Sequence, residues 1–272
     1  MFAFVISLVT AFYSSVLDSI GLLALGAFLL LALWHFRLRH QKAVIGFPGA
    51  TVISGLVIVI AAVAFFIHAV PGFQNTKMID HVVMSPRAIP FTMYFNFDKV
   101  AVAMVLALSG SLFLPQYSQI HFSKSASQNN LWRWVFLMWL SCSGTLMAAG
   151  LTIGYIAFDP KIMPYFWIWA ANNLLFVAFA EETLFRGMIQ RSLSEALGRF
   201  GWSPCTALVT SAVLFGLLHI YGGWTYVILA TVAGLFYGMA YLRTGLLIAP
   251  ILVHFLLNLT HALLFSYPAV NG

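Results

Sequence analysis

Two adjacent carboxylates and an arginine stand at the end of a long uncharged stretch. Residues 165–180 contain no Asp, Glu, Lys or Arg, and Glu181, Glu182 and then Arg186 follow directly. Ionisable groups inside an apolar span are costly to bury and are default candidates for function. On a helix, Glu182 and Arg186 lie at i,i+4 and can form an ion pair, whereas Glu181 points about 100° away from Glu182. We therefore expect Glu181 to face a different partner.

Two later apolar segments carry histidines. His219 lies near the end of one segment, and His254 and Asn258 lie one helical turn apart on the same face of the last segment. At a rise of about 1.5 Å per residue, the depths of Glu181, His219 and His254 overlap within a hydrocarbon layer of roughly 30 Å. Three helices can therefore bring these side chains to one level.

This set of side chains favours hydrolysis. A carboxylate beside a histidine can hold and deprotonate a water molecule that attacks a carbonyl carbon. A second histidine and an amide can donate hydrogen bonds to the oxyanion that forms. The chain has no Gly-x-Ser-x-Gly motif, and Cys142 and Cys205 are not placed suggestively with a histidine. We therefore do not expect covalent catalysis.

Composition places the chain among membrane proteins. Apolar residues make up 62% of the sequence and charged residues 7%, whereas soluble domains contain roughly 25% charged residues. The net charge is +6, but the 13 basic residues are scattered singly rather than gathered in a stripe. Nucleic acid is therefore not an expected partner, and the lipid bilayer is. Basic residues such as Arg37, Arg39, Arg191 and Arg243 follow alternate apolar segments, which predicts that these ends are cytoplasmic.

The apolar segments predict an all-α fold, a polytopic transmembrane helical bundle of about eight spans. The expected spans are residues 19–36, 49–70, 100–114, 131–158, a fifth that starts at 165 and ends beyond Glu182, 205–220, 224–242 and 246–267. Residues 1–17 either form a further span or lie in the interface, and Asp18 is the expected N-cap of the helix that follows.

The connections are expected to differ in kind. Residues 71–99 are predicted to form a long extracytoplasmic loop, and the loop that carries Lys124 is predicted to be cytoplasmic. Residues 188–200 have charges at i,i+4 spacing and predict a helix on the cytoplasmic surface. The chain then divides into 1–164, the N-terminal spans with the long loop, and 165–267, a catalytic core of four spans.

Three motifs in order resemble a known family. They are Glu-Glu-x-x-x-Arg at 181–186, Phe-x-x-x-His at 215–219 and His-x-x-x-Asn at 254–258. Together they look like the motifs of the CAAX-protease and bacteriocin-processing (CPBP, Rce1-like) family of intramembrane endopeptidases. No motif position departs from the family pattern, and the resemblance covers roughly residues 165–267.

The resemblance implies an intramembrane glutamate-type protease that needs no metal or other cofactor. It implies that Glu181 and His219 activate the water and that His254 and Asn258 form the oxyanion hole. Glu182 and Arg186 are then structural or substrate-orienting neighbours, and Phe215 packs against the water site. The implied substrate is a membrane-associated protein or peptide, a prenylated CAAX protein or a leader peptide among them. The implied setting is the cytoplasmic membrane of a bacterium or archaeon.

Two alternatives stay open. The first is a zinc-dependent membrane protease, in which Glu181, His219 and His254 are three ligands and a fourth position is open. Against it, the sequence lacks His-Glu-x-x-His. The second is a transporter or a membrane scaffold, because glutamates and histidines at mid-membrane also build proton relays. Against it, the chain shows no internal repeat.

Overall fold

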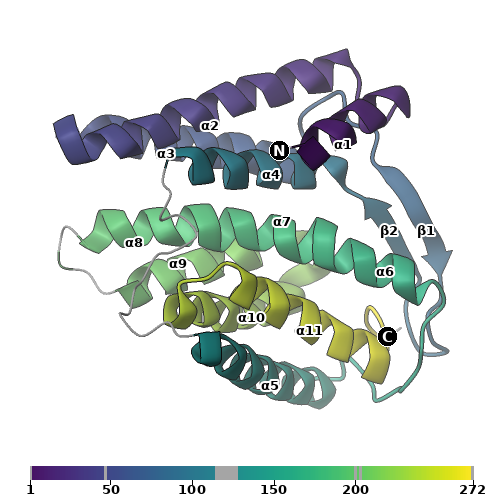
Figure 1. Ribbon diagram of the computed structural model, residues 1–272. Helices are drawn as coiled ribbons and strands as arrows, with labels where there is room; N and C mark the ends of the chain where they lie inside the picture. The colour runs from purple at the N-terminus through teal and green to yellow at the C-terminus, as the bar shows by residue number, and fades with distance from the viewer. Residues whose placement is uncertain (1, 46–47, 114–127, 199–200, 202–203, 271–272) are drawn as a thin grey trace.

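The computed structural model describes residues 2–45, 48–113, 128–198, 201 and 204–270; Lys124 of the expected cytoplasmic loop lies outside them. The described chain is a bundle of helices with one β-hairpin at its edge (Figure 1). The α-helices are α1 (Phe2–Tyr13), α2 (Ser19–Ile45), α3 (Pro48–Phe66), α4 (Phe97–Phe113), α5 (Gln128–Thr152), α6 (Phe166–Asn172), α7 (Phe179–Glu182), α8 (Arg191–Gly198), α9 (Pro204–Leu217), α10 (Gly223–Thr244) and α11 (Ile248–Leu264). Two π-helical segments, η2 (Asn173–Ala178) and η3 (Thr183–Gln190), and a 3-10 turn, η4 (Ile220–Gly222), complete the helical part.

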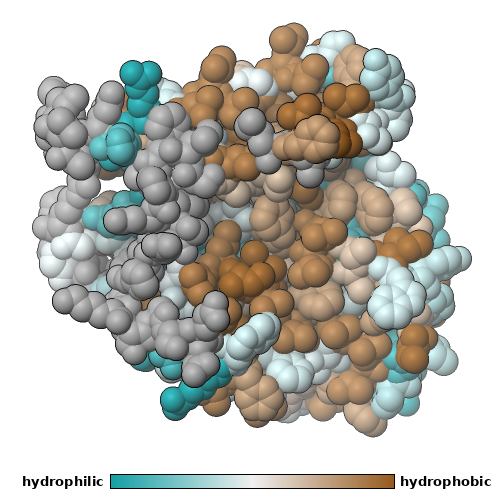
Figure 2. Space-filling model, viewed as in Figure 1, coloured by the Kyte–Doolittle hydropathy of each residue, from teal (hydrophilic) through white to brown (hydrophobic). Residues whose placement is uncertain are grey.

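The all-α helical bundle is confirmed. In the described part of the chain, four helical stretches are long and apolar enough to cross a membrane, namely Ser19–His40, Gly49–Phe66, Asn130–Thr152 and Ile220–Thr244. Phe4–Tyr13, Pro204–Leu217 and Ile248–Leu264 are shorter apolar helices. The number of eight spans therefore stays a prediction. Figure 2 shows hydrophobic side chains gathered over the middle of one face of the molecule.

Asp18 is the N-cap that the sequence predicts. Its Oδ1 accepts hydrogen bonds from the backbone N–H groups of Ile20 at 2.8 Å and Gly21 at 3.0 Å. These bonds satisfy two donors that the first turn of α2 would otherwise leave unpaired. The preceding helix, α1, has 12 residues and is shorter than the roughly 20 residues that cross a bilayer.

The expected loop of residues 71–99 contains a β-hairpin that the sequence analysis did not predict. Strand β1 (Thr76–Val82) pairs antiparallel with β2 (Phe91–Phe95). Ile79 and Met93 are register partners, and both are buried in a cluster with Trp169 of α6. The register of β1 shifts on both sides of Ile79, so this strand lacks the regular apolar alternation by which a sequence predicts a strand.

The segment that carries the two glutamates is one continuous helical rod from α6 through η2, α7 and η3 to α8 (Figure 1). This differs from the prediction of a separate surface helix at 188–200, since Gln190 and Arg191 are 3% and 6% exposed. The exposed side chain of Glu195 pairs with Arg191 and with Arg39 of α2, which joins this end of the rod to α2. Residues 199–200 lie outside the described part of the chain.

The rod lies between two groups of helices. On one side α2, α3 and α4 pack together and contact the rod through α4 and α3; on the other side α9, α10, α11 and α5 pack together (Figure 1). Helices α9 and α10 approach closely because small residues face each other: a Cβ added to Gly234 would lie 3.1 Å from the Cα of Ala212. Helix α5 precedes residue 165 but packs against α10 and α11. The division of the chain at residue 165 stays a prediction.

Candidate active site

Glu181 and Glu182 lie in α7, a single helical turn between the π-helical segments η2 and η3. π-helical turns are rare and frequently occur at functional sites. Glu181 and Glu182 are successive residues of α7, so their side chains point about 100° apart. The two carboxylates therefore lie in different surroundings.

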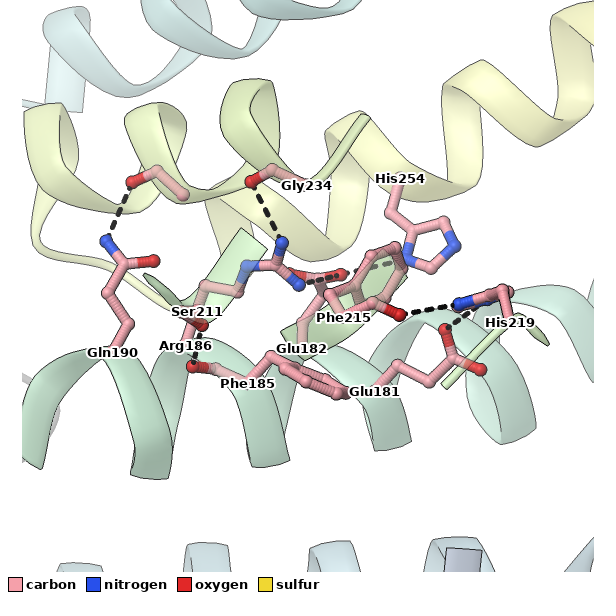
Figure 3. A network of polar contacts seen from close by, with 11 residues as sticks. Glu181, Glu182, Phe185, Arg186, Gln190, Ser211, Phe215, His219, Gly234 and His254 are labelled. Atoms are coloured by element: carbon pink, nitrogen blue, oxygen red, sulfur yellow. Dashed lines mark hydrogen bonds and ion pairs between the residues drawn. The ribbon is translucent and has the colours of Figure 1, made fainter. Parts of the chain in front are cut away.

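Glu182 is fully buried in a sealed network of charges. Its carboxylate is 3.0 Å from Nη1 of Arg186, which confirms the predicted i,i+4 pair. Its Oε1 is also 2.8 Å from Nδ1 of His254 on α11. Arg186 donates a further hydrogen bond from Nη2 to the carbonyl oxygen of Gly234 on α10, at 3.0 Å (Figure 3). Glu182 thus links three elements of the bundle.

Aromatic rings enclose this network. The Arg186 guanidinium lies 4.8 Å from the centre of the Phe215 ring and 5.3 Å from that of Tyr237, within the range of cation–π attraction. The Tyr237 ring stacks on His254 at 4.6 Å. Phe215, predicted to pack against the site, lies between Arg186 and the His219 ring, whose centre is 4.7 Å away.

Further along the rod, buried polar side chains are satisfied by backbone carbonyl groups. Gln190 donates to the carbonyl oxygen of Gly238 at 3.0 Å, and Ser211 of α9 donates to that of Phe185 at 3.0 Å (Figure 3). These bonds fix the packing of α9 and α10 on the rod.

Glu181 faces away from this network and toward His219. Its Oε2 is 3.9 Å from Nε2 of His219, and the two side chains are 12% and 19% exposed. Among the described residues, Glu181 Oε2 has no hydrogen-bond partner. The other ring nitrogen of His219, Nδ1, is 2.8 Å from the carbonyl oxygen of Phe215. A carbonyl oxygen only accepts, so Nδ1 carries the proton and Nε2 of the neutral ring is an acceptor.

Asn258 lies one turn beyond His254 on α11, and its amide donates to Oδ1 of Asn173 at 3.3 Å. Asn173 begins η2 and is 6% exposed. Sequence reasoning missed Asn173, although a buried amide eight residues before Glu181 was a readable signal. Tyr237, Gln190 and the carbonyl of Gly234 were also missed as parts of the site.

A cavity of about 760 Å³ lies beside Glu181 and His219. Its wall includes all four residues predicted to be catalytic, together with Asn173, Tyr226 and strand β2. The cavity thus extends from the rod to the hairpin, and its remaining wall is largely apolar and aromatic. Its volume lies within the roughly 300–1,000 Å³ typical of ligand sites. Glu182 and Arg186 do not line it.

The zinc alternative requires three ligands to converge on one ion. Among the described residues, no group of three or more His, Cys, Asp and Glu side chains is arranged to hold a metal ion. Nδ1 of His254 turns toward Glu182 rather than toward Glu181.

A comparison with protein families matches the region of the chain that carries the candidate site. Residues 163–260 match the family model described as type II CAAX prenyl endopeptidase Rce1-like. In this region the chain is similar to the Rce1-like family. CAAX prenyl endopeptidases are proteases, so the chain is assigned to the protease class of hydrolases. No curated protein and no solved structure matches the chain significantly.

The family assignment confirms the predicted resemblance and the predicted enzyme class. Together with four helices able to cross a membrane, it indicates an integral membrane protein that acts on a membrane-associated protein or peptide. The roles of the individual residues are not part of the family match and stay predictions.

Proposed function

We propose that the chain is an intramembrane endopeptidase in which Glu181 and His219 activate a water molecule for attack on a peptide bond. The observation that carries this proposal is the pair of acceptors that face each other across 3.9 Å on the cavity wall. A separation beyond 3.5 Å between two polar groups is the kind of gap that a water molecule bridges.

The two acceptors suit a single water molecule. Glu181 Oε2 has no partner among the described residues, and His219 Nε2 has an unprotonated lone pair when Nδ1 donates to Phe215. A water molecule that donates one proton to each acceptor directs its oxygen lone pairs toward a carbonyl carbon in the cavity. As the C–O bond forms, one proton passes from the water to this pair, and it later passes to the leaving amine.

His254 and Asn258 are the proposed oxyanion donors. The Asn258 amide carries two N–H groups, and one of them is directed to Asn173. Nδ1 of His254 is bound by Glu182, so Nε2 donates to the oxyanion when the ring carries both protons. In that form Arg186 and His254 balance the charges of Glu181 and Glu182. Glu182 and Arg186 then act by holding His254 in place.

The proposed reaction is metal-independent. A zinc-dependent protease would use Glu181, His219 and His254 as ligands, and metal analysis of the purified protein distinguishes the two mechanisms. Stoichiometric zinc, with activity lost to a chelator and restored by zinc, would establish the alternative. Activity that persists in metal-free protein supports the glutamate mechanism.

The proposed substrate is a membrane-associated protein or peptide, either a prenylated CAAX protein or a leader peptide. The apolar and aromatic wall of the cavity suits a segment delivered from the bilayer. We also propose the cytoplasmic membrane of a bacterium or archaeon as the setting. The remaining alternative, a transporter or scaffold, would keep the same polar network for proton relay or assembly.

Comparing protein termini in membranes tests the proposal directly. Cells express the wild type, Glu181→Gln or the control Asp80→Asn at matched abundance; Asp80 is an exposed carboxylate of the hairpin, away from the cavity. We expect new protein termini with the wild type and Asp80→Asn but not with Glu181→Gln. Identical termini in all three, alongside a transport or growth phenotype that survives Glu181→Gln, would favour the non-enzymatic alternative.

A further inference from the structure

Strand β2 borders the catalytic cavity along one of its edges. Four successive residues of β2, from Phe91 to Tyr94, line the cavity, and no residue of β1 does. Successive side chains of a strand point to opposite faces of its sheet. A cavity that meets four of them in a row therefore lies beside the edge of the strand rather than over one face. This edge is the one that faces away from β1.

The main chain of this edge has no partner in the described part of the chain. In an antiparallel pair, alternate residues direct their N–H and C=O groups toward the neighbouring strand, and the residues between them direct theirs away. Strand β2 pairs with β1 alone, and no other backbone hydrogen bond of the described residues involves Phe91–Phe95. Every second residue of β2 thus offers a backbone donor and acceptor at this edge.

The two edges of the hairpin differ in how they are protected. Strand β1 carries Lys77 and Asp80, and its register shifts on both sides of Ile79. Charges and bulges are devices by which edge strands avoid pairing with another chain. Strand β2 has the sequence Phe-Thr-Met-Tyr-Phe, without a charged residue. The outer edge is therefore protected, whereas the edge that faces the cavity is open to a further strand.

At the rim of the cavity, the chain itself pairs beside the start of β2. Ile89 donates a backbone hydrogen bond to the carbonyl oxygen of Ala269 at 3.1 Å, and Ala88 forms an antiparallel bridge with Val270. Ile89 and Ala269 both line the cavity. Extended chain is thus accommodated at this rim, and the free edge of β2 begins where this pairing ends.

From the rim the free edge leads toward the catalytic groups. Glu181 and His219 line the same cavity as β2. At the end of β2, the ring of Phe95 stacks on that of Phe176 at 4.9 Å. Phe176 precedes Glu181 by five residues of the rod, about 8 Å at 1.5 Å per residue. An extended peptide covers this length in about two or three residues.

We propose that the substrate binds in an extended conformation, as a third strand on the free edge of β2. This inference rests on the proposed function, because the strand is the substrate segment next to the scissile peptide bond. Backbone groups of the substrate pair with alternate residues of β2 and supply affinity, while the cavity wall contacts alternate side chains. A helical segment pairs its backbone groups internally, so it must unwind before it binds.

Replacing backbone amides of a peptide tests this strand. The probes are short N-palmitoylated peptides of alternating leucine and threonine, in which successive amides are replaced one at a time by esters, which lack the N–H donor. Full-length Glu181→Gln protein in nanodiscs keeps each probe intact, and fluorescence anisotropy gives its Kd. We expect binding about fivefold weaker for every second ester and unchanged for the esters between them. Equal effects at all positions, or a parent peptide that does not bind, would overturn the strand.

A matched pair of variants tests whether the strand lies on β2. Tyr94 of β2 and Met78 of β1 are 40% and 37% exposed, and only Tyr94 lines the cavity. A lysine on an edge strand disfavours the addition of another strand. In the Glu181→Gln protein, Tyr94→Lys should therefore raise the Kd of the parent peptide several-fold, and Met78→Lys should leave it unchanged. Equal Kd values for the two folded variants would overturn the placement on β2.

The same probes separate this inference from the proposed function. Wild-type protein is incubated with the parent peptide, and cleavage is followed by mass spectrometry. Alternating ester effects on binding without any cleavage by wild type would support the strand and contradict the proposed function. Cleavage by wild type without alternating ester effects would support the proposed function and overturn the strand.

Discussion

Glu181 and Glu182 are neighbours in the sequence but lie in opposite surroundings. Glu182 is fully buried and paired with Arg186 and His254, and it does not reach the cavity. Glu181 lines the cavity opposite His219 and keeps one oxygen without a partner among the described residues. Of two adjacent carboxylates on one helix, one can therefore stabilise the packing of neighbouring helices while the other remains available for chemistry.

The largest effect on stability is expected at the buried network of Glu182, Arg186 and His254, which we call the sealed side. Arg186→Met removes the guanidinium and leaves Glu182 as a buried carboxylate with only His254 as partner. Removing one member of a buried ion pair costs about 3–5 kcal/mol. We expect the free energy of unfolding, measured by denaturant titration in micelles, to fall by this amount. A variant as stable as wild type would contradict the stabilising role of the buried Glu182–Arg186 pair.

For a residue that lines the cavity, a substitution is expected to lower the rate of cleavage, by a factor that corresponds to a comparable free energy, rather than the stability. Asn258→Ala removes a proposed oxyanion donor, and loss of one such donor lowers kcat about 10²–10³-fold. Because Asn258 is only partly buried, we expect little change in unfolding. Steady-state cleavage by purified protein gives kcat, and an unchanged kcat would remove Asn258 from the oxyanion hole.

Packing on the sealed side is expected to be intolerant of small additions. A Cβ at Gly238 would lie 2.8 Å from Oε1 of Gln190 and 3.0 Å from the side chain of Leu208. Gly238→Ala should therefore destabilise the protein by about 1–3 kcal/mol. At Gly144 of α5 an added Cβ meets nothing within 4 Å, so Gly144→Ala is the matched control. Equal stability of the two variants in the same titration would contradict tight packing around Gln190.

The smallest effect is expected from Asn173, which positions Asn258 through one hydrogen bond. A neutral hydrogen bond contributes about 1 kcal/mol, so Asn173→Ala should lower kcat about fivefold and leave KM unchanged. If Asn173 acts only through Asn258, the double variant Asn173→Ala/Asn258→Ala should be no slower than Asn258→Ala alone. Additive losses in this double-mutant cycle would give Asn173 a role of its own.

The sequence predicted which side chains meet but not how each is held. Helical rise alone was enough to bring Glu181, His219, His254 and Asn258 to one cavity, because rise depends little on local detail. Rotation about the helix axis does depend on it, and the π-helical segments beside α7 alter that rotation. The partner of His254 was therefore not predicted, although Glu182 and Arg186 were correctly paired.

Polar residues inside uncharged stretches were also overlooked. Asn173 lies in a stretch that has no formal charge, yet its buried amide contacts Asn258. The hairpin was missed because the register of β1 shifts on both sides of Ile79, which interrupts the regular apolar alternation of a strand. The continuous rod was missed because charged residues at 191–199 resemble an exposed helix, whereas Arg191 is buried and pairs with Glu195, which also pairs with Arg39 of α2. Such long-range contacts are not visible in a local pattern.

The most direct measurement pairs the cleavage rate with the unfolding temperature for Glu181→Gln and Glu182→Gln, both in nanodiscs with a membrane-anchored peptide substrate. We predict that Glu181→Gln loses about 10²–10⁴-fold in rate, as expected for a general base, and unfolds at the wild-type temperature. Glu182→Gln should unfold at a lower temperature because a buried charge pair is broken. Wild-type cleavage by Glu181→Gln, or an equal loss of stability in both variants, would contradict the division of roles between the two glutamates.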